Sequence, residues 1–106
     1  MNEISTVNFY PIYQKEYNIR IIDVRDVSEY DSFHIHGSVN IPLNLLLEKH
    51  NFLLNKKYHY YIICNNGTRS KTASNFLDKL GYSITNILGG VERWPGLFVR
   101  TKRFKC

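Results

Sequence analysis

Residues 58–80 read YHYYIICNNGTRSKTASNFLDKL, a short apolar run followed by a polar turn and then a helical pattern. Tyr58–Ile63 ends at a cysteine and predicts a buried strand. In Thr68–Leu80, apolar residues recur at i, i+3, i+4 and i+7 from Ala73 onward, which predicts a helix with one apolar face. Gly81 stands where a helix C-cap belongs. This part of the chain therefore predicts a strand, a tight turn and a helix in succession.

The same alternation continues on both sides of this unit. Further strands are predicted for Ile19–Val24 and Ser83–Leu88, with weaker ones at Ile4–Val7 and Ser38–Ile41. Further helices are predicted for Leu43–Leu54, which follows Pro42, and for Asn8–Glu16. Strands that alternate with helices favour an α/β domain with a mainly parallel sheet, helices on both faces and right-handed crossovers.

Length and composition favour one domain over residues 1–106. The chain has 106 residues, 43% of them hydrophobic, which is enough for one core without metal or disulfide support. The formal net charge of +5 comes largely from a basic C-terminal tail, residues 100–106. The rest of the chain is nearly neutral, which argues against a nucleic-acid-binding face.

No stretch has the pattern of a signal peptide, a membrane span or a lipid anchor, so we expect a soluble, cytoplasmic protein without a membrane partner. Cys64 and Cys106 are not placed like a disulfide framework. His34 and His36 are close in sequence but lack further ligands nearby. We therefore expect neither a metal nor a cofactor, and a monomer rather than an oligomer.

The turn Cys64–Ser70 carries the chemistry that this sequence suggests. Cys64 follows a predicted strand and lies at the amino end of a predicted helix, where backbone N–H groups and the helix dipole stabilise a thiolate and a bound anion. Gly67 permits a tight turn, and Arg69 adds a cation that can hold an oxyanion. The alternative is that Cys64 is a buried apolar residue at the end of a strand, but packing explains neither the glycine nor the arginine.

Three blocks of the chain, between Ile19 and Gly96, make it resemble the rhodanese-like family in its single-domain form. The first block joins Asp23-Val24-Arg25, Glu29-Tyr30 and His34–Pro42; the second is the Cys64–Ser70 loop; the third is Leu88-Gly89-Gly90 with Trp94. Phe33 stands where the family usually has glycine, and His36 where it often has proline. The resemblance implies a five-stranded parallel sheet and a thiosulfate sulfurtransferase-type activity.

The resemblance also implies roles for individual residues. Cys64 is the nucleophile that accepts sulfur from a small anionic donor such as thiosulfate, becomes a persulfide and passes the sulfur to a thiol, cyanide or a protein thiol. Arg69 is expected to face the substrate. The backbone N–H groups that bind the substrate are those of Asn65, Asn66, Gly67, Thr68, Arg69 and Ser70.

Other polar and aromatic residues are interpreted as structural. Asp23 and Arg25, at the end of a predicted strand, are expected to support the fold by ion pairing. His34 is expected to organise a loop by hydrogen bonding, and Trp94 to belong to the core. A role for Cys106 in resolving a Cys64 persulfide stays open.

Two other functions remain. Cysteine-dependent phosphatases and arsenate reductases also surround an anion with cysteine and arginine, but four residues separate Cys64 from Arg69 here, one fewer than in the related phosphatase loops. A non-catalytic binding or regulatory module is the second alternative, because one fold serves many functions.

Overall fold

The computed structural model describes residues 1–102. In chain order, its elements are β1 (Asn2–Ser5), α1 (Thr6–Lys15), β2 (Ile21–Asp23), α2 (Val27–Ser32), β3 (Val39–Asn40), α3 (Leu43–Leu53), β4 (His59–Ile63), α4 (Thr68–Lys79), β5 (Ser83–Leu88) and the 3₁₀ turn η1 (Val91–Arg93). Cys106 and most of the basic tail lie outside the described residues, so the resolving role of Cys106 stays a prediction.

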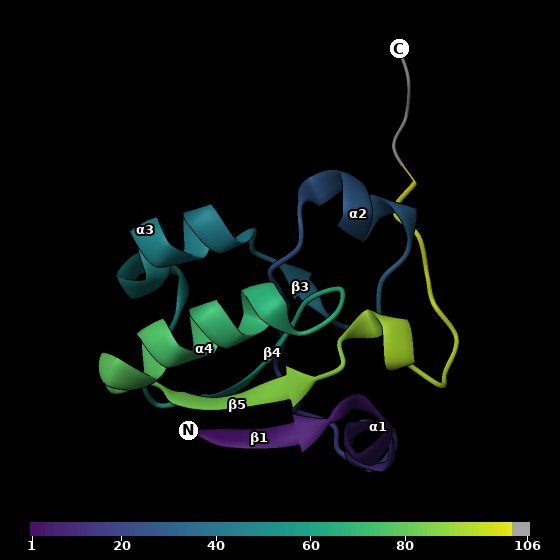
Figure 1. Cartoon of the computed structure of the whole chain (residues 1–106), viewed down its shortest axis with the longest axis horizontal. Coiled ribbons are helices and arrows are strands. Elements are labelled where there is room, and N and C mark those ends of the chain that lie inside the picture. Colours follow the sequence, from purple (N-terminus) through teal and green to yellow (C-terminus); the bar gives the residue numbers. More distant parts are fainter. Residues whose placement is uncertain (103–106) are drawn as a thin grey trace.

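The five strands form one sheet in the order β1-β5-β4-β2-β3, and all four pairings are parallel (Figure 1). β4 lies at the centre, and the two-residue strand β3 lies at one edge. The carboxyl ends of parallel strands meet at one edge of the sheet, so the segments that follow β2, β4 and β5 come together there.

Helices cover both faces of the sheet, and each face has its own apolar cluster. On one face, Leu46 of α3 and Leu77 of α4 pack against strand residues such as Ile62. On the other face, Phe9 of α1 packs with Ile87 and with the residues around η1. The predicted fold class, a parallel α/β sheet covered on both faces, is confirmed.

Most predicted elements are present with shifted ends, and α1 shows why the ends were wrong. Ile4–Val7 was predicted as a strand, but β1 ends at Ser5 and α1 begins at Thr6. Ser5 is the N-cap of that helix, and its hydroxyl accepts a hydrogen bond from the Asn8 N–H at 3.1 Å. The helix therefore begins two residues before the predicted Asn8 and contains Pro11 in its interior.

α2 and η1 were not predicted. Both are shorter than two helical turns, so neither has room for a repeating apolar pattern. α2 begins with a capping box, in which Asp26 accepts from the N3 backbone and the Glu29 side chain accepts from the Asp26 N–H at 3.1 Å.

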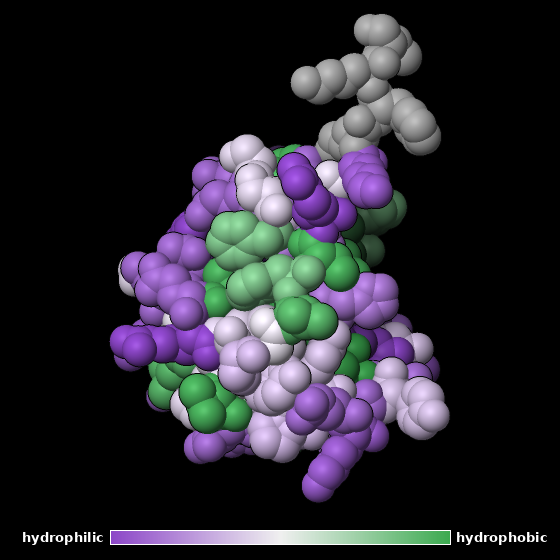
Figure 2. All heavy atoms as spheres, turned by 90° about the vertical axis from the view of Figure 1, so that its right-hand side faces the viewer, coloured by the Kyte–Doolittle hydropathy of each residue, from purple (hydrophilic) through white to green (hydrophobic). Residues whose placement is uncertain are grey.

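After η1, the chain runs past α2 as an extended segment. His34 and Val99 form an antiparallel bridge, with N–H to O distances of 2.8 and 2.9 Å. Figure 2 shows hydrophobic side chains gathered on this face of the molecule, where Phe33 and Phe98 are partly exposed and their ring centroids lie 5.0 Å apart. Over residues 1–102, none of the helices has the length and apolar character needed to cross a membrane.

Candidate active site

The cysteine singled out in the sequence lies at the carboxyl edge of the sheet. Cys64 directly follows β4, and the loop after it leads into α4, between α2 and η1 (Figure 1). Cys64 exposes none of its surface. The sulfur therefore lies in an enclosed position.

The loop supplies hydrogen-bonding groups to the sulfur. The Gly67 N–H donates to Cys64 Sγ at 3.1 Å, and the thiol lies 3.4 Å from Ser70 Oγ, to which it donates. Gly67 has a φ of +105°, a value that L side chains rarely adopt, and it is the N-cap of α4. When the thiol ionises, the Ser70 hydroxyl can turn and donate to the thiolate, so that two donors then stabilise the negative charge.

The start of the loop is fixed from outside by η1. The Val91 N–H donates to the Cys64 carbonyl at 2.9 Å, and the Glu92 N–H donates to the Asn65 carbonyl at 3.1 Å. Gly90 makes this contact possible, because a Cβ there would overlap both carbonyl oxygens. The backbone of Cys64 and Asn65 is thus held by Val91 and Glu92, which belong to a segment distant in the sequence.

The two asparagines of the loop are both engaged. Asn66 Oδ1 accepts a hydrogen bond from the Thr68 N–H at 3.1 Å, and Asn65 Nδ2 donates to Glu92 Oε1 at 3.0 Å. Of the six N–H groups predicted to bind the substrate, that of Gly67 thus points to the sulfur, while that of Thr68 is bonded to its neighbour's side chain. The assignment of the others to substrate binding stays a prediction.

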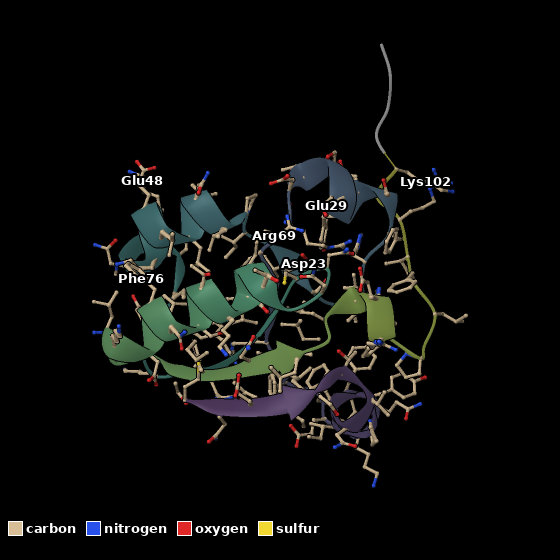
Figure 3. All side chains as sticks on the ribbon, viewed as in Figure 1. Asp23, Glu29, Glu48, Arg69, Phe76 and Lys102 are labelled. Atoms are coloured by element: carbon tan, nitrogen blue, oxygen red, sulfur yellow. The ribbon has the colours of Figure 1, made fainter. Side chains whose placement is uncertain are left out.

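Arg69 is held by a glutamate from α2. Its guanidinium donates to both carboxylate oxygens of Glu29, at 2.7 and 3.0 Å, and Figure 3 shows the two side chains close together. The hydrogen bond from Arg69, assisted by one from the Asp26 backbone, lowers the pKa of Glu29 from 4.5 to about 2, although desolvation opposes the shift. The same pairing raises the pKa of Arg69. Arg69 is therefore expected to face the substrate as one member of an ion pair with Glu29.

Sequence reasoning had not assigned Glu29 or Glu92 to the site. Glu29 lies 40 positions before Arg69, and Glu92 lies 27 positions after Asn65. No local spacing rule connects residues so far apart. The one available signal was that Glu29 belongs to a sequence block on which the family resemblance rests.

Asp23 and Arg25 form a buried pair beneath this region. Both are almost fully buried, and the guanidinium donates to the carboxylate at 3.0 to 3.1 Å. Arg25 Nη2 also donates to the Phe33 carbonyl at 2.6 Å, and Asn40 Nδ2 donates to the carbonyls of both residues of the pair. The pair thereby links the ends of β2, α2 and β3, a geometry that supports the structural role predicted for it.

His34 is likewise held by a residue of α2. Its Nδ1 lies 2.7 Å from the Tyr30 carbonyl, and its ring stacks on the Tyr30 ring with centroids 3.7 Å apart. Within residues 1–102, no three His, Cys, Asp or Glu side chains gather as a metal site would require. The chemistry that the described site offers is that of an enclosed cysteine at a helix N-terminus.

Comparison with known proteins identifies the family and the fold. The family model of the rhodanese-like domain matches residues 12–96. YrkF of Bacillus subtilis (strain 168), named for a proposed role as a sulfur carrier protein, is 37% identical over 95 residues, which are 89% of this chain and 51% of that protein. This chain thus spans about half the length of that relative.

A second relative matches over nearly its whole length. YtwF of Bacillus subtilis (strain 168), named for a proposed sulfurtransferase activity, is 31% identical over 91% of this chain and 92% of its own. Among solved structures, a rhodanese-related protein from Thermoplasma volcanium is 30% identical, with a TM-score of 0.83 over 93% of this chain and 98% of its own. Together with the family model, these matches confirm the resemblance seen in the sequence.

Proposed function

The chain belongs to the family of rhodanese-like domains, and from this premise we propose that it is a sulfurtransferase that carries a sulfane sulfur on Cys64. The observation that carries the proposal is the position of Cys64 Sγ, 3.1 Å from the Gly67 N–H at the start of α4. A sulfur held there by a backbone donor and the helix dipole is suited to react as a thiolate. The relatives named for sulfur transfer and sulfur carriage support the same chemistry.

The reaction takes two steps. The Cys64 thiolate attacks the outer sulfur of a donor; with thiosulfate, the S–S bond breaks, sulfite leaves with the bonding electron pair, and Cys64 becomes a persulfide anion. A second thiophile, such as cyanide or a thiolate, then attacks the outer sulfur of that persulfide. The S–S bond breaks again, its electron pair returns to Cys64, and the thiolate is restored.

Groups of the loop are expected to stabilise the negative charge on the reacting sulfur. The Gly67 N–H and the Ser70 hydroxyl are placed to stabilise the thiolate and the persulfide anion. The burial of Cys64 favours a donor that presents a narrow, terminal sulfur atom.

The intact mass of the protein tests the proposal. Reduced protein is incubated briefly with thiosulfate and weighed, then weighed again after cyanide or a thiol is added; Cys64→Ser is the first control and Cys106→Ser the second. We expect a gain of one sulfur atom that requires Cys64 and disappears on adding the acceptor. Loss of turnover in Cys106→Ser alone would show that Cys106 resolves the persulfide.

Failure of thiosulfate alone to load Cys64 would not refute the proposal. If thiosulfate transfers nothing, the experiment is repeated with an organic persulfide. Failure with both donors would refute the proposal and leave a binding module as the better interpretation. Hydrolysis of an aryl phosphate at a rate comparable to sulfur transfer would instead favour a phosphatase.

A further inference from the structure

The only cation within the Cys64–Ser70 loop is neutralised by its partner. Arg69 forms a two-point ion pair with Glu29, whose low pKa keeps it ionised across the physiological range. Asp26, at the start of the same helix, adds a second negative charge that acts on Arg69. A donor that enters the site therefore does not meet a free guanidinium.

A further carboxylate lies on the opposite side of the loop. Glu92 of η1 is exposed and accepts a hydrogen bond from the Asn65 side chain at 3.0 Å. Asn65 and Asn66 are neutral, and Arg25 is bonded to its own carboxylate. The groups that directly contact the loop thus carry one positive and two negative charges, those of Arg69, Glu29 and Glu92.

Two other cations lie close by in the sequence. Lys71 of α4 and Arg93 of η1 are both exposed, and neither forms an ion pair with another residue in the range 1–102. Water and salt screen such charges strongly. They therefore offset the carboxylates less than a cation held against the sulfur would.

This balance of charges around the loop affects different sulfur donors differently. Thiosulfate brings two negative charges, and its leaving group, sulfite, carries two away. With an organic hydropersulfide, R–S–SH, the Cys64 thiolate attacks the outer sulfur, the S–S bond breaks, and R–S⁻ leaves with the electron pair. The outer sulfur keeps its hydrogen, and Cys64 becomes Cys64–S–SH.

We propose that Glu29 and Glu92 determine donor specificity, disfavouring the thiosulfate dianion and selecting organic hydropersulfides as the sulfur source. The inference rests on the proposed sulfur transfer at Cys64. Glu29 acts through Arg69 and is a positioning residue, because it both fixes the guanidinium and cancels its charge. Glu92 acts through Asn65 and through its own negative charge beside the loop.

The test measures the rate constant of sulfur loading on Cys64 by intact mass, with thiosulfate and with cysteine hydropersulfide as donors. Four forms of the full chain are compared: the wild type, Glu29→Gln, Glu92→Gln and Glu48→Gln. Glutamine keeps an amide oxygen that still accepts a hydrogen bond while it removes the charge. Glu48 lies on α3, far from the loop in Figure 3, and is the matched control.

In the wild type we expect faster loading from cysteine hydropersulfide than from thiosulfate. Glu29→Gln and Glu92→Gln should each raise the thiosulfate rate constant about fivefold, the effect expected of one charge near the reacting anion, and should change the hydropersulfide rate constant much less. Added salt should accelerate thiosulfate loading in the wild type, and less so in the two variants. Glu48→Gln should match the wild type with both donors.

Three results would overturn the inference. Thiosulfate loading at least as fast as hydropersulfide loading in the wild type would refute the specificity while leaving the proposed function intact. Equal losses with both donors in the variants would show that the glutamates have a structural role only. Failure of every donor to load Cys64 would refute the proposed function, and this inference with it.

Persulfidated serum albumin, used in place of cysteine hydropersulfide, distinguishes a protein source from a small one. Transfer from albumin would support an organic hydropersulfide carried by a protein. Transfer from cysteine hydropersulfide alone would support a small donor of the same chemistry.

Discussion

Gly90 is the position at which a single added methyl group should separate the segment after β5 from the loop that carries Cys64. Its φ of 62° and ψ of −163° belong to a region that is essentially restricted to glycine. A Cβ on this residue would overlap the carbonyl oxygens of Cys64 and Asn65. The atoms in the way are backbone atoms, which cannot turn aside as a flexible side chain can.

The cost of Gly90→Ala follows from these two features. The backbone conformation costs about 1 to 3 kcal/mol for a residue other than glycine. Relief of the overlap moves η1 away from the loop and weakens the hydrogen bonds from Val91 and Glu92, each worth about 1 kcal/mol. The total of about 3 to 5 kcal/mol is a large part of the stability of a small domain.

Gly37→Ala is the matched control. Gly37 also has a positive φ, of +90°, but nothing lies within 4 Å of a Cβ placed there. That substitution should cost only the conformational term, about 1 to 2 kcal/mol. The difference between the two variants isolates the close approach of Gly90 to the loop.

Urea denaturation measures the free energy of unfolding of both variants, which are compared at a constant m-value. We expect the midpoint of Gly90→Ala to fall well below that of Gly37→Ala, and sulfur loading on Cys64 to slow in the folded fraction of Gly90→Ala alone. Equal free energies of unfolding for the two variants would refute the reasoning, because the predicted overlap would then not exist. If Gly90→Ala does not fold at all while Gly37→Ala does, the predicted order of the two stabilities is confirmed.

Three further substitutions test the surroundings of the loop. Asp23→Asn leaves the buried Arg25 without its carboxylate and should lower the free energy of unfolding by about 3 to 5 kcal/mol, measured in urea; a loss below about 1 kcal/mol would contradict the pairing. Because Arg69 lowers the pKa of Glu29 to about 2, ionised Glu29 stabilises the fold fully above pH 4.5, and this contribution is lost as the pH falls from 4.5 to 2. Over that range the wild type should lose stability more steeply than Glu29→Gln, and parallel curves would count against the ion pair. Ser70→Ala should slow sulfur loading on Cys64 about tenfold through loss of the hydroxyl donor, whereas Thr72→Ala, at an exposed position on the same helix, should leave the rate unchanged.

The parts of the fold predicted correctly are those in which a local pattern is long enough to repeat. β5 has the predicted bounds, and α4 differs by one residue, because its apolar stripe repeats over two turns. β3 keeps only two of its four predicted residues, since pairing with β2 stops at Asn40 and Pro42 follows two positions later. Fold class followed from the order of these elements and did not depend on their exact ends.

For the site, sequence predicted what the loop itself contains, but its surroundings were missed. Cys64, Gly67 and Ser70 are three positions apart in the chain, and the turn and helix that they belong to fix their contacts. Glu29, Gly90 and Glu92 reach the loop from segments that lie beside it only after the sheet has formed. Their contribution depends on strand order, which no single segment encodes.

The placement of Glu29 shows how the buried pair could influence donor choice. Arg25 is fixed by Asp23 at the end of β2 and donates to the Phe33 carbonyl, directly after α2. That bond and the capping box at Asp26 hold both ends of this short helix, and the helix in turn places Glu29 against Arg69. Two domains with the same Cys64–Ser70 loop could therefore differ in the free charge of the arginine, according to what α2 carries. Donor preference in this fold should be inferred from the partner of the loop arginine as well as from the loop sequence.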